Sequence, residues 1–152
     1  VEAGLAPLSG LQVEVDHSVD GHRLVTDLVV TLHSGGTRMY EADRGTMAGH
    51  RLTARLAAYA RYATHTIHVG PRHLVGRTEH YWRRRYPGQD RFPDVMVVFD
   101  GLPHDALQRR SDRLHQDARR IRAVRDGTVP VFATTIEGLR ANPNTGGRLG
   151  RD

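Results

Sequence analysis

The chain has 152 residues, of which 38% are hydrophobic and 26% charged, enough apolar material for one domain with its own core. It contains no cysteine, which excludes disulfides, thiolate metal sites and cysteine nucleophiles. No apolar run approaches the ~20 residues that a membrane-spanning helix needs. All 22 basic residues are arginine, and they exceed the 17 acidic residues to give a net charge of +5. Arginine binds phosphate through paired hydrogen bonds, so we expect nucleic acid as a partner, and no membrane.

The two ends of the chain predict loose segments around a single domain. Residues 1–10 form a lead-in without the basic start or long apolar stretch of a secretory signal. Residues 141–152 are rich in Gly, Asn and Pro and predict a flexible tail. The domain itself is expected over residues 11–140. The absence of cysteine fits a cytoplasmic setting.

The first half of this domain predicts three strands and then a helix. Alternating or β-branched residues predict strands at 11–15 and 22–32, and a Gly-Gly turn leads into a return strand at 37–42. An amphipathic helix is predicted over 51–65, because apolar side chains recur there at helical spacing: Leu52, Leu56, Tyr59 and Ala63.

The second half predicts alternating strands and helices. Residues 65–76 resemble a loop, and a short helix is expected from Thr78 to Tyr86, before Pro87 and Gly88. Four elements follow: a buried strand at 92–100, a long charged helix over 104–125, a buried strand at 129–135 and a short helix over 136–141. An antiparallel hairpin followed by strand-helix-strand crossovers defines an α/β fold, one mixed sheet with helices on both faces.

Three carboxylates mark the ends of the hairpin strands. Asp27 lies in the first strand, and Glu41 and Asp43 end the second, two residues apart and therefore on one face of it. Carboxylate oxygens are the ligands that Mg2+ prefers, so the hairpin predicts a metal site. The simpler interpretation is that these acids cap strand ends or pair with neighbouring arginines: Arg44, Arg51 and Arg55.

The element order and the acidic hairpin together resemble the PD-(D/E)xK nuclease superfamily, which has the restriction-endonuclease-like fold. Asp27 matches the Asp of the motif, and Glu41-Ala42-Asp43 matches the (D/E)xK triplet, with Asp43 in the place of lysine. RLAAY at 55–59 has the spacing of the Gln-x-x-x-Tyr motif of the RecB-like branch, with Arg55 in the place of Gln.

A closer resemblance is to the actinobacterial replication-relaxation family, whose members are linked to plasmid and mobile-element DNA. It covers roughly residues 12–140 and rests on stretches in a fixed order: EADRGT (41–46), RLAAY (55–59), FPDVMVVFD (92–100), QRRSDRLHQDARR (108–120) and VPVFATTIEGL (129–139). The resemblance implies DNA as a partner, together with proteins of a plasmid or mobile-element complex. Family members often carry a winged-helix segment ahead of this domain, which these residues do not include.

The resemblance also implies a chemistry. Asp27, Glu41 and Asp43 would hold Mg2+, which polarises the scissile phosphate and activates a water molecule. Arg55 would contact phosphate or supply the charge that the missing lysine leaves out. A nuclease fold does not by itself establish cleavage, so a catalytically inactive DNA-binding or protein-interaction module is the alternative.

Clusters of arginine predict where DNA would bind. One cluster follows the hairpin, a second consists of residues 83–85, and a third lies along the long helix. The candidate contacts are Arg44, Arg51, Arg55, Tyr59, Arg83, Arg84, Arg85, Arg109, Arg110 and Arg113. The alternative for the long helix is a solvated face whose arginines pair with Asp105, Asp112, Asp117 and Asp126.

Overall fold

The structure is a computed structural model that describes residues 8–71, 73, 76–142 and 146–150. Its strands are β1 (Leu8–Asp16), β2 (Val25–Leu32), β3 (Thr37–Asp43), β4 (Thr66–His68), β5 (Thr78–His80), β6 (Asp94–Phe99), β7 (Val131–Thr135) and β8 (Gly147–Arg148). Its helices are α1 (Gly49–Thr64), the 3-10 helix η1 (Tyr81–Arg84), α2 (His104–Ala118), α3 (Arg122–Arg125) and α4 (Ile136–Ala141).

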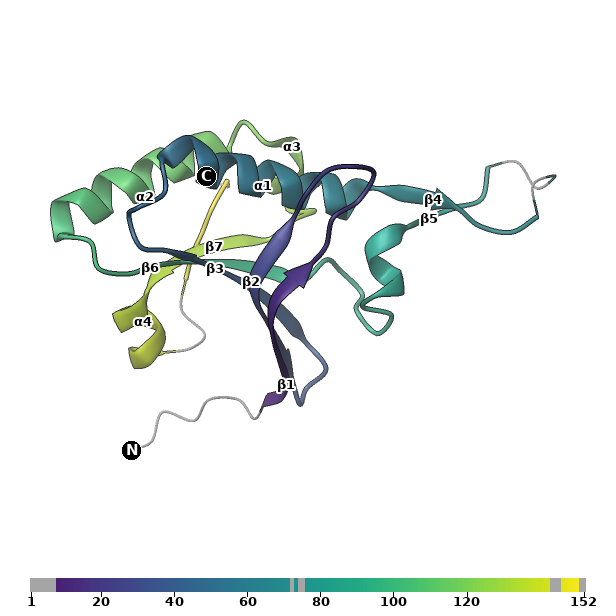
Figure 1. Cartoon of the computed structure of the whole chain (residues 1–152), viewed down its shortest axis with the longest axis horizontal. Helices are drawn as coiled ribbons and strands as arrows, with labels where there is room; N and C mark the ends of the chain where they lie inside the picture. The colour runs from purple at the N-terminus through teal and green to yellow at the C-terminus, as the bar shows by residue number, and fades with distance from the viewer. Residues whose placement is uncertain (1–7, 72, 74–75, 143–145, 151–152) are drawn as a thin grey trace.

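One six-stranded mixed sheet organises the domain, in the order β1-β2-β3-β6-β7-β8 (Figure 1). The strands β1, β2 and β3 form an antiparallel meander, and β6 and β7 then run parallel to β3. The crossovers carry α1, α2 and α3 on one side of the sheet, while α4 lies on the other side. This confirms the mixed α/β fold predicted from the sequence.

Helix α1 is the main covering element of the sheet. Its apolar residues fall every three or four positions, so they share one face and are buried there: Leu52, Leu56, Tyr59, Tyr62 and Ala63. They join a core cluster with sheet residues such as Met39 and Val97, both fully buried. None of the described helices is both long and apolar enough to cross a membrane.

The segment 65–93 differs from the predicted loop and α-helix. Strands β4 and β5 pair as a short hairpin, from Thr66 opposite His80 to His68 opposite Thr78, and η1 replaces the predicted helix. Strands of three residues are too short to show an alternating pattern in the sequence. Trp82 anchors η1, because its ring is buried and meets that of Phe92 edge-on at 5.5 Å.

The helix predicted over 104–125 is interrupted. Helix α2 ends at Ala118, and α3 begins only after Ile121, whose backbone is extended at φ −88° and ψ 109°. The turn redirects the chain so that Ala123 and Val124 are buried. An apolar stripe that continues across a break of this kind cannot be told from one continuous helix by spacing alone.

Of the predicted flexible tail, the structure describes residues 141–142 and 146–150, and the latter pack against the sheet. Gly147 and Arg148 pair with β7, and Leu149 is buried. Gly150 has φ +81°, and a Cβ there would lie 3.0 Å from Cγ1 of Val124. The glycine therefore permits close packing at this point. Residues 143–145 and 151–152 lie outside the described part.

Candidate functional site

Glu41 is buried beneath α1, with 2% of its surface exposed. Side chains alternate along β3, so Met39, Glu41 and Asp43 are all buried on the helix-covered face. Arg55 and Tyr59 lie one turn apart on α1 and both reach Glu41. Arg55 places Nε 2.6 Å and Nη2 2.5 Å from Oε2, and the Tyr59 hydroxyl donates to Oε1. One helix therefore holds both oxygens of this carboxylate.

Burial raises the pKa of Glu41 from its ordinary value of 4.5 to about 7. The hydrogen bond from Tyr59 and the charge of Arg55 act in the opposite direction but do not outweigh the loss of water. Burial also raises the pKa of Tyr59, so its hydroxyl remains a proton donor. The Glu41 carboxyl group therefore titrates near neutral pH.

Asp27 lies where β2 and β3 separate. The ladder between these strands runs from Thr31 opposite Thr37 to Leu28 opposite Tyr40. Asp27 is the residue before Leu28, and its Oδ2 accepts a hydrogen bond of 2.9 Å from the backbone N–H of Ala42 on β3. The Asp27 side chain thus takes the place of a strand carbonyl. Its other oxygen lies 3.6 Å from Nη2 of Arg55.

Asp43 forms a separate ion pair with α2. Arg110 donates to both oxygens of this carboxylate, with Nη2 2.9 Å from Oδ1, and also to the carbonyl of Met47. The backbone N–H of Gly45 donates to Oδ1 of Asp43 at 3.0 Å. The Asp43 side chain is fully buried and that of Arg110 is 18% exposed. Arg110, a predicted DNA contact, thus fastens α2 to the end of β3.

The three hairpin carboxylates do not fit a magnesium ion as they are arranged. Within the described part of the chain, no group of three or more Asp, Glu or His side chains is placed to hold a metal. Asp27 and Glu41 share the guanidinium of Arg55, and Asp43 has that of Arg110. A divalent cation would need the same oxygen lone pairs and would be repelled by the arginine charge. The arrangement matches the ion-pair interpretation, with Arg55 as the partner.

A chain of hydrogen bonds continues from Glu41 through the core. The Tyr59 hydroxyl lies 2.9 Å from Oγ1 of Thr26, which lies 2.8 Å from Nδ1 of His17. Nε2 of His17 is 2.6 Å from the hydroxyl of Tyr86. Burial lowers the pKa of His17 to about 4, so its ring is neutral. His17 and Thr26 could not be predicted as part of this network, because the residues around them form no motif.

Four of the predicted DNA contacts are exposed around the first turn of α1. Arg109 and Arg113 of α2 line a groove whose other wall is Gly49 and Leu52. Arg51 belongs to that same turn of α1, and Arg44 follows Asp43, which is bound to α2. All four arginines are exposed. We refer to the groove lined by Arg109 and Arg113, together with the nearby exposed Arg44 and Arg51, as the basic groove.

The remaining predicted contacts lie elsewhere or are engaged. Tyr59 is fully buried and so cannot touch DNA in this arrangement. Arg83 donates to the carbonyls of Gln89 and Asp90 at 3.0 and 2.9 Å and lies 4.7 Å over the ring of Trp82. Arg84 and Arg85 are exposed, at the opposite end of α1 from the basic groove, where η1 packs.

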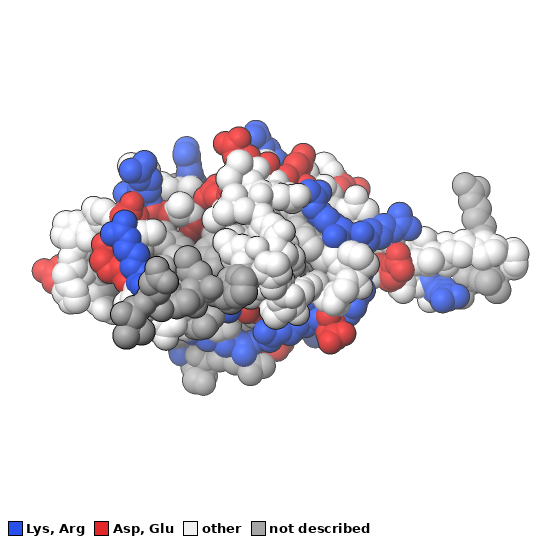
Figure 2. Space-filling model, turned by 90° about the horizontal axis from the view of Figure 1, so that it is seen from below, with Lys and Arg blue, Asp and Glu red and all other residues white. Residues whose placement is uncertain are grey.

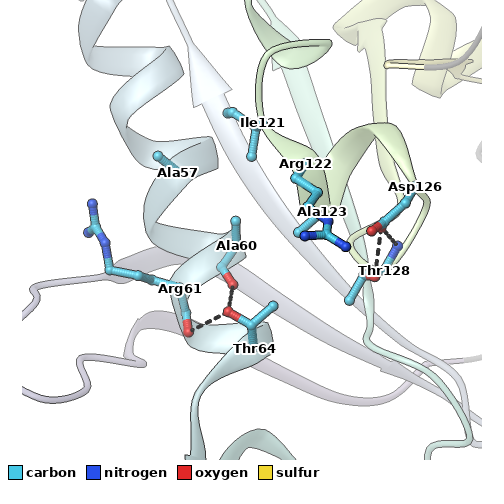
Figure 3. Close-up of a pocket in the computed structure, with 9 residues that line it drawn as sticks. All are labelled: Ala57, Ala60, Arg61, Thr64, Ile121, Arg122, Ala123, Asp126 and Thr128. Carbon is cyan, nitrogen blue, oxygen red and sulfur yellow. Dashed lines mark hydrogen bonds between the residues drawn. The ribbon is translucent and has the colours of Figure 1, made fainter.

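A wider groove lies between α1 and α3 (Figure 3). Ala57, Ala60 and Ala123 line it, and the exposed Arg61 and Arg122 also border it. The Thr64 hydroxyl donates to the carbonyl of Ala60 at 2.8 Å, and Asp126 accepts two hydrogen bonds from Thr128. Figure 2 shows the face on the far side of the sheet from α1. Among the described residues, few charged side chains lie at the centre of this face.

Comparisons with family models, with curated proteins and with solved structures find no match to this chain. The resemblances to the replication-relaxation family and to the PD-(D/E)xK nucleases therefore stay predictions.

Proposed function

We propose that this chain is a DNA-binding domain of the restriction-endonuclease-like fold, in which the hairpin carboxylates stabilise the fold and do not catalyse DNA cleavage. The observation that carries the proposal is the pairing of each buried hairpin carboxylate with an arginine of a covering helix, beside a groove whose other arginines face solvent.

The nuclease-like part of the proposal is supported by the convergence of residues that are distant in the sequence. Asp27, Glu41, Arg55 and Tyr59 occupy the positions that the resemblance assigns to the acidic motif and to the helix after it. They come from β2, β3 and α1 and form one cluster. An antiparallel meander followed by a helix and a parallel strand supports the same fold.

Binding without cleavage is favoured by the chemistry of this cluster. Arg55 supplies a permanent positive charge between Asp27 and Glu41, the charge that a metal would otherwise bring. A guanidinium does not release its proton and therefore cannot act as a base toward water. Plasmid or mobile-element DNA, with proteins of such a complex, is the context that the resemblance suggests.

DNA binding is favoured by the charges around the basic groove. Helix α1 begins at Gly49 without a side-chain cap and without an acidic residue in its first turn, so the partial positive charge of its N-terminus is not offset. Arg51 and Arg109 form no ion pair within the described residues, and Arg113 pairs with Asp117 on its own helix at 3.2 Å. Phosphate groups would find both arginine side chains and backbone N–H groups here.

The test is a salt titration of duplex DNA binding by fluorescence anisotropy. The logarithm of the association constant of wild type should fall linearly with the logarithm of salt concentration, because each neutralised phosphate releases counterions. The double variant Arg109→Gln/Arg113→Gln should bind more weakly on every sequence, and its salt slope should be smaller by about 2. Arg140→Gln on α4, across the sheet, is the matched control and should bind as wild type. No binding by wild type at low salt, or equal loss in the control, would contradict the proposal.

A further inference from the structure

A small polar cleft lies where η1 meets α1 and the end of β1. Asp16 and Ser18 form one side of it, Tyr62 its inner wall, and Tyr81, Arg84 and Arg85 the other side. Its volume is about 290 Å³. It is separate from the basic groove, since Tyr62 lies ~20 Å along α1 from Gly49 at 1.5 Å per residue.

The inner wall carries a proton donor with no partner. Tyr62 is 2% exposed as a whole and lines the cleft, and its hydroxyl, which forms no hydrogen bond with the described residues, is the atom open to solvent there. The ring is fixed by contacts with His17 at 5.0 Å and Phe92 at 5.9 Å. Burial raises the pKa of Tyr62, so the hydroxyl stays protonated. The hydroxyl therefore faces the cleft, where it can donate a hydrogen bond to an anionic ligand atom.

The cleft also holds an accessible guanidinium. Arg85 lines the cleft, and its side chain is exposed to solvent. Arg85 donates to the backbone carbonyl of Asp16 at 3.4 Å and has no ion-pair partner in the described chain. The neighbouring carboxylates are engaged, because Asp16 accepts from the N–H of Ser18 at 2.8 Å and Glu79 pairs with Arg84 at 3.3 Å. A phosphate would find Arg85 and the Tyr62 hydroxyl together.

Tyr81 supplies an aromatic surface beside that guanidinium. Its side chain is 37% exposed, although its ring meets those of Tyr62 and His65 edge-on, at 6.4 and 5.7 Å. The backbone N–H of Tyr81 donates to the carbonyl of His65 at 2.9 Å, which holds it at the end of α1. A fixed, partly exposed aromatic ring next to an arginine is how proteins stack an unpaired base and bind its phosphate.

We propose that this cleft binds one unstacked nucleotide of single-stranded DNA, with the base against Tyr81 and a phosphate between Arg85 and the Tyr62 hydroxyl. The cleft is too small for a base pair and suits one planar ring joined to one anion. Duplex DNA keeps its bases stacked and cannot fill it. This inference rests on the proposed DNA-binding function and adds a contact that distinguishes single strands from duplexes.

The test compares a single-stranded oligonucleotide with the duplex of the same sequence, by fluorescence anisotropy at low salt. Tyr81→Leu removes the stacking ring from an exposed position. Tyr62→Phe removes only a hydroxyl that makes no hydrogen bond, so the fold is expected to tolerate it. Each variant should lower single-strand affinity about ten-fold, while duplex affinity stays as in wild type. Tyr40→Phe, a tyrosine of β3 outside the cleft, is the matched control.

The single strand also carries 2-aminopurine, whose fluorescence falls when it stacks. Wild type should quench it, and Tyr81→Leu should not. Unchanged single-strand affinity and quenching in both cleft variants would overturn the inference, while intact duplex binding through the basic groove would leave the proposed function in place. If wild type binds neither form of DNA, the proposed function and this inference both fail.

Discussion

Arg55 lies directly on Glu41, with its Nη2 2.5 Å from the buried carboxylate and 3.6 Å from that of Asp27. The same nitrogen also donates to the backbone carbonyl of Val25. One side chain of α1 thus ties together β2 and β3 at the point where their ladder ends. Removing one partner of a buried ion pair lowers the free energy of unfolding more than replacing both partners with apolar residues, because the remaining charge is left without a partner.

The substitution Arg55→Met should therefore destabilise the domain by about 3 kcal/mol at pH 8. Arg55 lowers the pKa of Glu41, so its loss raises that pKa further, and the folded variant must then hold a proton on Glu41 that the unfolded chain releases at pH 8. The measurement is the free energy of unfolding in urea. The double variant Arg55→Met/Glu41→Met should recover much of the loss, since it removes both charges from the same site. Equal or additive losses in the double variant would argue against a coupled pair.

The second buried pair should behave in the same way for α2. Asp43→Asn removes the charge that Arg110 binds and weakens the turn at Gly45, so the free energy of unfolding should fall by about 3 kcal/mol. DNA binding by the folded variant should be retained, because Asp43 does not line the groove and the exposed Arg109 and Arg113 are unchanged. Asp112→Asn, an exposed acid of α2, is the control and should change stability little. Loss of DNA binding without loss of stability would instead assign Asp43 to the DNA contact.

The sequence predicts the mixed sheet because its strongest signals are local. The continuous apolar run of β6 and the spacing of Leu52, Leu56 and Tyr59 each specify an element without reference to the rest of the chain. The short elements could not be predicted. A strand of two residues such as β8 exists only because β7 pairs with it, and no periodicity records that.

The candidate site was predicted in its membership but only partly in its roles. Asp27, Glu41, Arg55 and Tyr59 do come together, and the ion pair of Glu41 with Arg55 was one of the two interpretations. Arg110 was predicted as a DNA contact. Its pairing with Asp43 could not be predicted, because it joins positions 67 residues apart and depends on how α2 crosses β3. The Tyr62 hydroxyl gave no signal, since a tyrosine on the inner face of a helix predicts only packing.

The pH dependence of stability should identify Glu41. Its pKa is raised on folding, so the folded state holds a proton that the unfolded state releases between about pH 4.5 and 7. The stabilisation is therefore complete below pH 4.5 and is lost as the pH rises through about 7. Glu41→Gln mimics the protonated form and lacks this titration. The stability of wild type minus that of the variant should fall by about 3 kcal/mol across this range.

That difference is informative because other acids contribute the opposite slope. Hydrogen bonds and arginines lower the pKa of Asp117 and Asp126, so their contribution is lost on acidification. Both carboxylates are present in wild type and in Glu41→Gln, and their effects cancel in the comparison. A flat difference between the two proteins from pH 4 to 8 would contradict the raised pKa of Glu41.

The ion pairs also predict how the domain responds to divalent metal. Millimolar Mg2+ or Mn2+ should neither raise the melting temperature of wild type nor produce nicking of plasmid or single-stranded DNA, because the carboxylate oxygens that a metal needs are bound by Arg55, Tyr59 and Arg110. Glu41→Ala should behave like wild type in the cleavage assay, and Asp112→Ala controls for the loss of an acidic residue. Nicking that requires metal and disappears only in Glu41→Ala would mean that Arg55 moves off Glu41 when DNA binds, and the hairpin carboxylates would then be a working metal site.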